Sequence, residues 1–363
     1  MFEKRKIAFF LPDMAGGGAE RVQLAIMRHL VAAGHQVDLI LAFGGGVLLP
    51  LVPPEVRIIE LRAGRLGSSL VGLVRYLKAK KPWSLHAIMW PCTVLAVAAK
   101  MVARSNAKLL LSDHTFLSDH YASPRTRRIL RLSMKALYPR AEHRVAVSKG
   151  AAADVAKLAG LSDSEVEVIY NPVDLPEVVA ENAAARQQWQ GASPRIISVG
   201  AFKAEKNHDL LIRAFARVVQ RFPDARLVIL GEGALRAHLE ALRDDLGLGD
   251  KVRLPGFQLD PWPYLAGADL FVLSSDYEGM SLVLVEALHA GLKVVSTDCE
   301  AGPAELLQGG NYGRLSPVGD GAALARAMIE ELETASDPGR QRVRASEITG
   351  RRNLERYEQL LAG

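Results

Sequence analysis

The sequence predicts an α/β protein of two domains, each a parallel β-sheet covered by helices on both faces. The chain has 363 residues, which is long enough for two separate hydrophobic cores. Short apolar runs alternate with helix-length periodic segments, the pattern of successive βαβ units. The alternation breaks once, at residues 171–194, where three prolines and an alanine-rich interval precede the next apolar run. We therefore expect an N-terminal domain over residues 1–172, a linker over 173–194 and a C-terminal domain over 195–347.

Six apolar runs predict the strands of the N-terminal domain. They span residues 6–12, 37–43, 56–61, 84–90, 108–114 and 144–148. Residues 19–34 place apolar side chains at helical spacing and end at Gly34, which predicts a helix after the first strand. The longest apolar stretch, residues 85–103, is interrupted by a histidine, a proline and a lysine. We interpret it as a strand, a break and a buried helix, and not as a membrane span.

Five further runs predict the strands of the C-terminal domain. They span residues 195–200, 226–231, 251–257, 270–275 and 293–298. Residues 281–290 predict a helix that Gly291 ends as a C-terminal cap. No strand follows the charged amphipathic helix over residues 348–363, which we expect to pack back on the first domain. Both domains are thus Rossmann-like, and because such sheets bind ligands beyond the carboxyl ends of their strands, we expect a site in a central cleft that both sheets face.

The composition is that of an ordinary soluble protein, with 49% hydrophobic and 23% charged residues. Cys92 and Cys299 lie far apart without metal-ligand spacing, which favours a reducing cytosol. The N-terminal apolar run is short and reaches no small-residue cleavage site, so it does not predict a signal peptide. Residues 1–172 carry 24 basic and 13 acidic side chains, although the whole chain has a net charge of +5. A basic half favours an anionic partner: nucleic acid, a phosphorylated substrate or acidic lipid.

The first strand-to-helix loop contains three consecutive glycines, Gly16, Gly17 and Gly18. Glycines let backbone amides approach a ligand closely, and the helix N-terminus that follows favours negative charge, so a diphosphate or an anionic acceptor suits this loop. The loop is not the GxGxxG fingerprint, and no acidic residue ends the second strand, which argues against a dinucleotide cofactor. A plain structural turn is the alternative.

Two lysines, Lys203 and Lys206, follow the first strand of the C-terminal domain. Lysines at the start of a helix oppose its macrodipole unless an anion offsets them, which favours phosphate binding over a solvated face. Asn207 is explained as a helix cap. Phe257, at the end of the third strand of this domain, is a candidate wall for a base-binding slot.

Glu278 and Glu286 lie eight residues apart on either side of an apolar run. Glu278 falls in the loop after a buried strand and Glu286 falls inside the next helix, so they do not form an adjacent helical pair. Glycoside hydrolysis needs two carboxylates that flank one bond. This arrangement favours instead two carboxylates that bind two parts of one extended ligand, with an exposed helix edge as the alternative.

The fifth strand of the N-terminal domain ends on Ser112, Asp113 and His114. Histidine is the side chain best suited to proton or hydroxyl contacts near neutral pH, and the carboxyl end of a parallel strand is where ligands bind. We therefore select His114 over His120, which lies further into the loop.

Residues 123–144 interleave basic and apolar side chains at helical spacing. The basic residues expected to contact a membrane are Arg125, Arg127, Arg128, Arg131 and Lys135. A basic amphipathic helix of this kind can lie on anionic lipid. The alternative is a helix packed on its domain with the basic side in water, and the positive charge of this half favours the membrane surface.

Taken together, these segments resemble the retaining nucleotide-sugar glycosyltransferases of family 4, which have the GT-B fold. The segment EGMSLVLVEAL, residues 278–288, is similar to the Glu-x7-Glu motif of that family. The glycine-rich segment that begins at Gly16 resembles the N-terminal signature, and the stretches STDCEAGPAELL and YGRLSPVGD also fit. The resemblance covers nearly the whole chain and extends to the subset that builds bacterial lipid-linked oligosaccharides, O-antigens and capsules.

The resemblance implies a role for each matching residue. Glu286 would hold the ribose hydroxyls of the donor, and Glu278 the hydroxyls of its sugar near the reacting centre. Lys206 would bind the diphosphate, and His114 would contact the sugar. The remaining donor-binding residues implied are Gly16, Gly17, Gly18, Lys203, Phe257, Gly279, Met280, Ser281 and Leu282.

The chain departs from the family pattern in two places. Ala201 stands where many members have an arginine, so Lys203 is the candidate for that positive charge. Met280 and Ser281 replace the usual Phe-Gly, which puts the sugar contacts in doubt. No DxD motif ends a strand, so we expect no metal and no other cofactor. The resemblance implies transfer with retention at the anomeric carbon, by same-face attack in which the leaving phosphate takes the proton of the acceptor.

The expected donor is a UDP-hexose or UDP-N-acetylhexosamine, and the expected acceptor is a glycan linked to polyprenyl diphosphate. The enzyme would be cytoplasmic and peripheral on the anionic inner face of the cell membrane, with no nucleic acid as partner. A soluble GT-B sugar or glucan synthase is the alternative among enzymes. A non-catalytic nucleotide-sugar binding protein is the alternative of another class.

Overall fold

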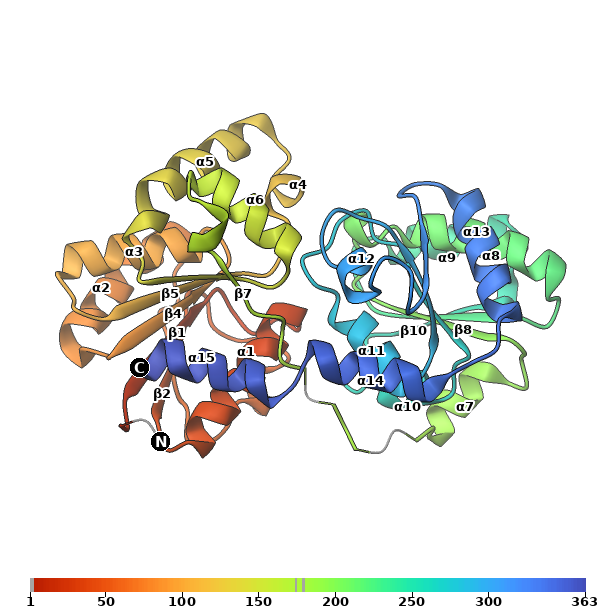
Figure 1. Cartoon of the computed structure of the whole chain (residues 1–363), viewed down its shortest axis with the longest axis horizontal. Coiled ribbons are helices and arrows are strands. Elements are labelled where there is room, and N and C mark those ends of the chain that lie inside the picture. The colour runs from red at the N-terminus through yellow and green to blue at the C-terminus, as the bar shows by residue number, and fades with distance from the viewer. Residues whose placement is uncertain (1–2, 174, 178–179) are drawn as a thin grey trace. The chain divides into compact units, whose positions relative to one another are not determined.

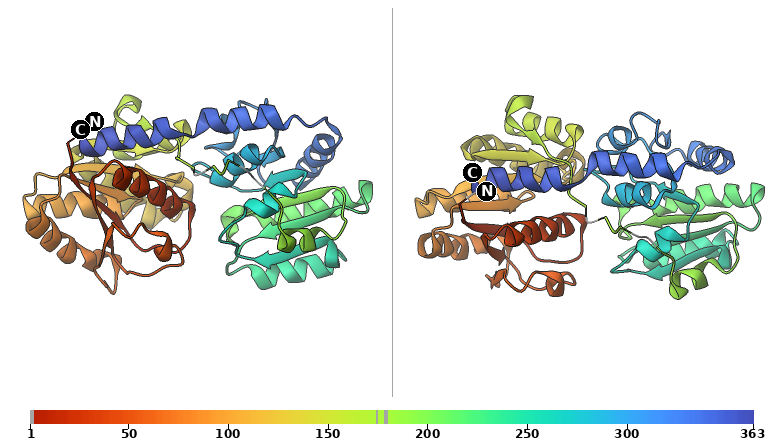
Figure 2. Two further views of the ribbon diagram at one scale, coloured as in Figure 1. Left: turned by 90° about the horizontal axis from the view of Figure 1, so that it is seen from below. Right: turned by 60° about the horizontal axis from the view of Figure 1, so that its bottom comes forward.

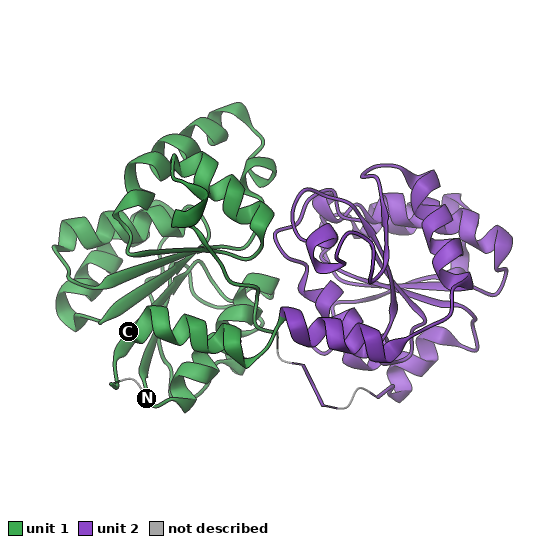
Figure 3. Cartoon of the chain, in the orientation of Figure 1, with its two compact units in different colours: residues 1–173, 349–363 green, residues 174–348 purple. Residues whose placement is uncertain are grey.

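The computed structural model of the protein describes residues 3–173, 175–177 and 180–363. The chain divides into two compact units, coloured separately in Figure 3. Unit 1 comprises residues 1–173 and 349–363, and unit 2 comprises residues 174–348. Each unit has its own parallel sheet with helices on both faces (Figure 1), which confirms the predicted fold class.

The sheet of unit 1 has seven strands within the described residues, in the order β3-β2-β1-β4-β5-β6-β7. Their bounds are β1 Lys6–Leu11, β2 Gln36–Leu41, β3 Arg57–Glu60, β4 Ser84–Ile88, β5 Lys108–Asp113, β6 His143–Ala146 and β7 Glu167–Val168. All neighbours pair in parallel. The six predicted strands are confirmed, whereas β7, of two residues, was too short to show a pattern.

Helices cover both faces of this sheet (Figure 1). Their bounds are α1 Gly18–Ala32, α2 Ser69–Lys80, α3 Cys92–Ala103, α4 Leu117–His120, α5 Pro124–Leu137, α6 Lys149–Ala159 and α15 Arg351–Ala362, with short 3-10 helices η1 Leu49–Leu51, η2 Leu66–Ser68, η3 Tyr138–Arg140 and η4 Asp163–Glu165. Helices α2, α3, α5 and α6 lie on one face, and α1 and α15 lie on the other.

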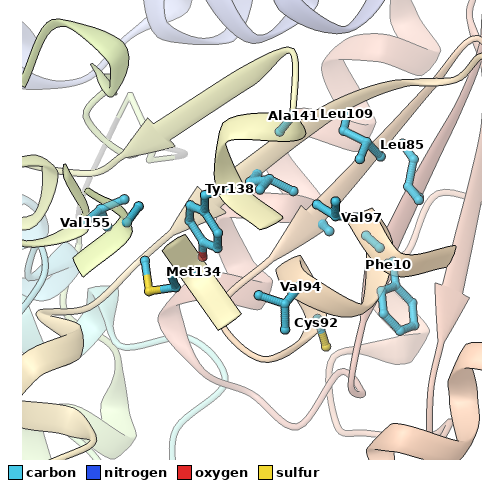
Figure 4. Close-up of a cluster of buried hydrophobic side chains, with 14 of the residues drawn as sticks. Phe10, Leu85, Cys92, Val94, Val97, Leu109, Met134, Tyr138, Ala141 and Val155 are labelled. Carbon is cyan, nitrogen blue, oxygen red and sulfur yellow. The ribbon is translucent and has the colours of Figure 1, made fainter. Parts of the chain in front are cut away.

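Strand β1 shows how the core is divided between these two faces. Ala8 and Phe10 belong to the buried cluster under α2, α3, α5 and α6, and Figure 4 shows part of it around Met134 and Tyr138. Phe9 points the other way and meets the ring of His86 edge-on at 5.2 Å. Alternate residues of a strand face opposite sides, so a continuous apolar strand is buried on both.

Helix α15 returns the end of the chain to unit 1. It contacts α1, β4 and β5, and Figure 2 shows it beside α1. Ser84 Oγ donates a hydrogen bond to Leu361 O at 2.7 Å, and His29 Nε2 lies 2.7 Å from Glu358 Oε2. The C-terminal helix thus belongs to the same compact unit as the N-terminal sheet.

The sheet of unit 2 has six strands within the described residues, in the order β10-β9-β8-β11-β12-β13. Their bounds are β8 Arg195–Val199, β9 Arg226–Leu230, β10 Val252–Gly256, β11 Leu270–Leu273, β12 Lys293–Thr297 and β13 Arg314–Ser316. All pairs are parallel. The five predicted strands are confirmed, and β13 adds a short edge strand.

Helices again cover both faces of the sheet. Their bounds are α7 Ala183–Trp189, α8 His208–Arg221, α9 Arg236–Asp245, α10 Trp262–Ala266, α11 Leu282–Ala290, α12 Pro303–Leu306, α13 Gly321–Glu333 and α14 Pro338–Ile348, with 3-10 helices η5 Ala204–Lys206 and η6 Gly249–Lys251. Helices α8, α9 and α13 enclose one buried cluster with the sheet. Helix α11 packs against α10 and α14 on the other face.

The predicted linker over residues 173–194 is wrong in its second half, because this part contains α7. Asn182 caps the helix by accepting a hydrogen bond from Ala185 N at 2.9 Å. Trp189 at its end is fully buried, so the segment belongs to the core of unit 2. Its alanines and polar residues resembled a linker because a single apolar anchor shows no periodicity. Residues 174, 178 and 179 of the predicted linker lie outside the described residues.

Candidate active site

The predicted residues follow the carboxyl ends of the strands in both units. In unit 1, the loop Gly16–Gly18 follows β1 and His114 follows β5. In unit 2, Lys206 follows β8 and Glu278 follows β11. Because all strands of each sheet are parallel, these ends meet at one edge of that sheet. Each unit therefore gathers its own candidate residues at its own edge.

Lys206 and Glu278 form an ion pair, with Lys206 Nζ 2.6 Å from Glu278 Oε1. Strands β8 and β11 are neighbours in the sheet, which brings the two loops together. Ser275 Oγ donates a hydrogen bond to the same carboxylate oxygen at 2.7 Å. Glu278 is only 7% exposed. The fold thus holds a buried carboxylate by two donors, and Ser275 was not selected from the sequence.

The turn that carries Lys206 is tied to the loop after β11. Ser274 Oγ donates to Lys206 O at 2.8 Å, and Asp276 N donates to Glu205 O at 2.9 Å. Asn207 caps α8 by accepting from Leu210 N, as expected, and its side-chain amide also donates to Asp276 Oδ1 at 2.8 Å. These bonds fix the backbone of Lys206 beside Glu278.

Lys203 stands at the N-cap position of η5, before Lys206, and is exposed. The structure places it at the same turn, but not in the Lys206–Glu278 pair. The two lysines of this loop therefore differ in environment: one is held against a buried carboxylate and the other faces solvent.

The N-terminus of α11 lies directly after Glu278. Ser281 is its N-cap residue, and both Met280 and Ser281 are buried. Gly302, with φ of 96°, lies so close that a side chain there would come within 3.2 Å of Gly279 O. The backbone of Gly279 and Met280 therefore packs against the loop after β12. Amides at a helix N-terminus favour an anion.

Glu286 lies within α11 and is 8% exposed. The alternative of an exposed helix edge is therefore wrong, because α11 is covered by α10 and α14. Gly291 ends the helix in the left-handed conformation, as predicted. Glu278 and Glu286 are thus two buried carboxylates at the start and in the middle of one buried segment.

Phe257 and Cys299 also lie in loops that follow strands of unit 2. Phe257 follows the outer strand β10, two strands away from β8, and is 42% exposed. It is not brought to the Lys206–Glu278 pair. Burial, together with the charge of Glu278, raises the pKa of the Cys299 thiol to about 12. Cys299 is therefore protonated at neutral pH and is not a nucleophile.

His114 of unit 1 is engaged through its Nε2 atom. Gln23 Nε2 lies 3.3 Å from it and Ser112 Oγ lies 3.2 Å from it. Burial lowers the pKa of His114 to about 4, with Asn171 acting in the opposite direction. His114 is thus a neutral hydrogen-bonding group at pH 7. His120, the competitor, is exposed at the end of α4.

Asp113 beside it is a buried carboxyl group with raised pKa. Burial raises the pKa to about 7, although Tyr138 Oη donates a hydrogen bond to Oδ2 at 2.9 Å. Thr93 Oγ1 lies 2.9 Å from the same phenol oxygen. Asp113 therefore changes its charge near neutral pH, inside unit 1.

The glycine loop of unit 1 has a second loop packed against it. Gly17 is the N-cap of α1, and Gly18 is the first helical residue. Met14 N donates to Gly45 O at 3.0 Å, and Leu48 N donates to Met14 O at 3.0 Å. The loop after β2 thus braces the Gly16–Gly18 loop, a contact that the sequence did not indicate.

Helix α5 carries the basic residues predicted for membrane contact. All five are exposed: Arg125, Arg127, Arg128, Arg131 and Lys135. On the same helix Ile129 is 50% and Leu132 60% exposed, whereas Leu130 and Met134 are buried. Arg127 also donates to Ser118 O at 2.6 Å. The outer surface of α5 therefore combines positive charge with exposed apolar side chains.

Two absences apply to the described part of the chain. No helix there combines the length and the apolar character needed to cross a bilayer. The same residues contain no cluster of three or more His, Cys, Asp or Glu side chains arranged to hold a metal ion. The stretch 85–103 is β4 followed by α3, as expected.

The fold is GT-B. Over 98% of both chains it superimposes on the crystal structure of Anabaena Alr3699/HepE in complex with UDP and glucose, with a TM-score of 0.82 and 22% identity. The family model for Glycosyltransferase Family 4 matches residues 16–177, and that for Glycosyl transferases group 1 matches residues 179–348. The chain belongs to the family 4 glycosyltransferases.

Two relatives of this chain are named as glycosyltransferases. The N-acetylgalactosamine-N,N'-diacetylbacillosaminyl-diphospho-undecaprenol 4-alpha-N-acetylgalactosaminyltransferase of Campylobacter jejuni is 29% identical over 347 residues, 91% of this chain and 90% of that protein. The lipopolysaccharide core biosynthesis glycosyltransferase LpsE of Rhizobium meliloti is 37% identical over 168 residues, 46% of this chain and 47% of that protein.

Proposed function

We propose that the chain transfers a hexose or N-acetylhexosamine from a UDP-sugar to a glycan linked to polyprenyl diphosphate. Transfer proceeds with retention at the anomeric carbon and without a metal ion. The observation that carries the proposal is the ion pair between the partly exposed Lys206 and the buried Glu278, just before the N-terminus of α11. A relative whose name specifies a diphospho-undecaprenol substrate, and a structural neighbour solved with UDP, support the acceptor and donor classes.

In this proposal the Lys206–Glu278 ion pair breaks when the donor diphosphate binds. Lys206 then donates to the phosphate oxygens, with the amides of residues 279–282 as further donors. The Glu278 carboxylate, still held by Ser275, is freed to accept hydrogen bonds from hydroxyls of the sugar. Glu286 accepts hydrogen bonds from the ribose hydroxyls.

The chemistry follows from the groups that this edge offers. Cys299 is held protonated by burial, and Glu278, still bound by Ser275, accepts hydrogen bonds from the sugar hydroxyls, so we assign neither as a nucleophile toward the anomeric carbon. In the mechanism that the family resemblance implies, the acceptor hydroxyl attacks from the face that the diphosphate leaves. One carbon–oxygen bond forms as the other breaks, and a phosphate oxygen takes the proton of the acceptor. Lys206 stabilises the negative charge on the leaving group.

The residues of unit 1 have auxiliary roles in this proposal. His114 contacts the sugar as a neutral imidazole, since burial keeps its pKa at about 4. The amides of Gly16–Gly18, at the N-terminus of α1, bind phosphate. We further propose that Phe257 contacts the base and that Lys203 binds the diphosphate.

The lipid-linked acceptor accords with a peripheral position on the anionic inner face of the membrane. Helix α5 offers five exposed basic residues together with Ile129 and Leu132. Basic side chains near an anionic surface contribute about 1 kcal/mol each, and exposed apolar side chains add partition into the interface. We place α5 against the lipid headgroups.

A donor screen tests the proposal. UDP-, GDP- and ADP-sugars are compared for their effect on the melting temperature, and those that raise it are tested for transfer to polyprenyl diphosphate-linked glycans. We expect a UDP-sugar to raise the melting temperature and its sugar to appear on the lipid-linked acceptor with the anomeric configuration of the donor. Transfer to soluble glucans alone would favour the soluble synthase. Donor binding without transfer to any acceptor would favour a binding protein.

A further inference from the structure

Gln23 is a fully buried polar residue on the first helix of unit 1. It is 0% exposed, and the other buried residues of α1 are apolar: Val22, Leu24, Ala25, Ile26, Met27 and Leu30. A buried amide is costly unless it is hydrogen-bonded. Its amide nitrogen lies 3.3 Å from Nε2 of His114, 91 residues away in the sequence. A buried glutamine at this position is therefore tied to the proposed sugar-contacting histidine.

His114 lies inside a chain of polar contacts that runs from Gln23 to His86. Ser112 Oγ lies 3.2 Å from His114 Nε2 and 2.8 Å from His86 Nε2. Gln23 Nε2 carries only donor hydrogens, so His114 Nε2 accepts from it. Ser112 then has one proton to give, to His114, and it accepts one from His86. In this arrangement every contact has one donor and one acceptor.

His86 and His114, the two histidines of this hydrogen-bond network, are both neutral. His86 is fully buried and its pKa lies well below the ordinary value, through burial and then the charge of His114. His86 is the titratable group that faces His114 in this network. A neutral imidazole carries one proton, and which nitrogen holds it depends on the bonds of the other nitrogen.

We propose that Gln23 is a positioning residue that keeps the proton of His114 on Nδ1 by donating to Nε2. This inference rests on the proposed function, in which His114 contacts the sugar. With Nε2 occupied by Gln23 and Ser112, the proton is left on Nδ1, which is itself buried, and Asn171 is a further hydrogen-bond partner of the ring. The orientation of the ring and the position of its proton are then set before substrate binds, which lowers the cost of ordering it at the reacting centre.

Nitrogen-15 NMR of the histidine rings tests the inference without substrate. The signal of His114 in the full chain is assigned by its loss in His114→Gln, and its two ring nitrogens are then read as protonated or not. We expect Nδ1 protonated in the wild type between pH 6 and 8. In Gln23→Glu the new carboxylate can only accept, so the proton should move to Nε2 and the ring should titrate at higher pH.

Gln23→Met and Gln341→Leu complete the set. Gln23→Met keeps the length of the side chain but loses the donor, so the Nδ1 preference should weaken. Gln341 of unit 2 donates to Tyr312 O at 3.3 Å, and its loss should leave His114 unchanged. A wild-type His114 protonated on Nε2, or an unchanged ring in both Gln23 variants, would overturn the inference. If Gln23→Glu fails to fold, the wild type and Gln23→Met still decide.

Turnover gives a second readout. In Gln23→Glu we expect kcat at pH 7 to fall by about 10-fold or more and its pH profile between 6 and 8 to change, because protonation of His114 moves into that range. The Kd for UDP, which lacks the sugar, should stay within about 2-fold. An unchanged pH profile would contradict the inference. Absence of transfer in the wild type would count against the proposed function alone, since the NMR result does not depend on it.

Discussion

Glu278 illustrates how single residues of this fold are prepared for chemistry. Its carboxylate is 7% exposed and is held by Lys206 and Ser275. A buried carboxylate without partners costs several kcal/mol, so the two donors are needed before any ligand arrives. In the proposed function Lys206 turns to the donor diphosphate, while Ser275 still donates to the carboxylate. Lys206 and Glu278 therefore stabilise each other in the fold and are also the side chains proposed to act in catalysis.

Glu278→Gln should separate donor binding from transfer. Glutamine keeps the shape but loses the charge that strengthens bonds to the sugar hydroxyls, so we expect kcat to fall by about 100-fold. The Kd for UDP should change by less than about 3-fold. Steady-state transfer and calorimetric titration of the same preparation measure both.

Glu333→Gln is the matched control, because Glu333 is an exposed carboxylate at the C-terminus of α13. It should change kcat by less than about 2-fold. A Glu278→Gln enzyme with the turnover of the wild type would contradict the role given to Glu278.

Asp113 predicts a pH dependence of stability. Its pKa is about 7 in the folded protein, against an ordinary value of about 4. The folded state therefore binds a proton that the unfolded state has lost between these values, and stability falls as pH rises from 4 to 7. Asp113→Asn removes this loss, so its advantage over the wild type should grow by on the order of 2 kcal/mol between pH 5 and 7.

Thermal melts at several pH values measure the effect. Asp163→Asn, an exposed aspartate of the same unit, should follow the wild type at every pH. Parallel curves for Asp113→Asn and the wild type would show that Asp113 does not titrate in this range.

For single residues, the sequence indicated which side chains follow a strand, but it did not indicate their hydrogen-bond partners. Lys206, Glu278 and His114 could be selected because each follows a strand, where ligands bind in parallel sheets. Gln23 and Ser275 could not, because their importance depends on contacts that only the folded chain creates. A glutamine within an apolar helical face is the one local signal that could have pointed to Gln23.

Close contacts between the loops at the carboxyl ends of the strands fix the positions of these loops. The loop after β9 illustrates it, because Gly231 has φ of 158° and a side chain there would lie 1.9 Å from Gly200 O. Gly200 itself begins the loop that leads to Lys206. The close approach of two backbone segments thus sets the position of the loop that carries the lysine.

Gly231→Ala should destabilise unit 2 and displace this loop. The overlap with a backbone atom cannot be relieved by a rotamer change, so we expect a loss of about 3 kcal/mol or more, seen in the melting temperature. Gly247→Ala is the control, since Gly247 also has a positive φ of 66° but nothing within 4 Å of its side-chain position. It should cost about 1–2 kcal/mol. Equal losses in the two variants would exclude close approach as the cause.

At the scale of elements the sequence predicted the long strands and helices, because apolar periodicity reports them directly. Strands β7 and β13 have two and three residues, too few to show a period. Helix α7 was missed because its contribution to the core is concentrated in Trp189, after a run of alanine and glutamine. Short elements are specified by tertiary contacts more than by their own pattern.

For the whole molecule, the uneven distribution of charge is the feature that supports the proposed contact with an anionic membrane. Residues 1–172 carry the excess of basic side chains, and α5 displays five of them. Exposed Ile129 and Leu132 lie among these charges. The proposed membrane contact therefore lies in unit 1, which accords with the proposed lipid-linked acceptor.

Charge reversal on α5 should weaken membrane binding. Arg128→Glu/Arg131→Glu changes two exposed residues, and we expect at least about 10-fold weaker binding to vesicles that contain anionic lipid, since each basic residue contributes about 1 kcal/mol. Binding of the wild type should fall as salt rises. Vesicle co-sedimentation at two salt concentrations measures both effects.

Arg75→Glu/Lys78→Glu on α2 makes the same change of net charge on another exposed surface of unit 1. It should weaken vesicle binding by less than about 3-fold. Equal losses in the two double variants would mean that net charge, and not α5, attracts the chain to the membrane.

Calorimetric titration of UDP and uridine into the wild type and Lys206→Met shows whether Lys206 binds the donor diphosphate. If the Lys206–Glu278 edge of unit 2 binds the donor diphosphate, UDP should bind the wild type at least about 10-fold more tightly than uridine, and this difference should largely disappear in Lys206→Met. Equal affinities for UDP and uridine in the wild type, or an unchanged preference for UDP in Lys206→Met, would contradict the account.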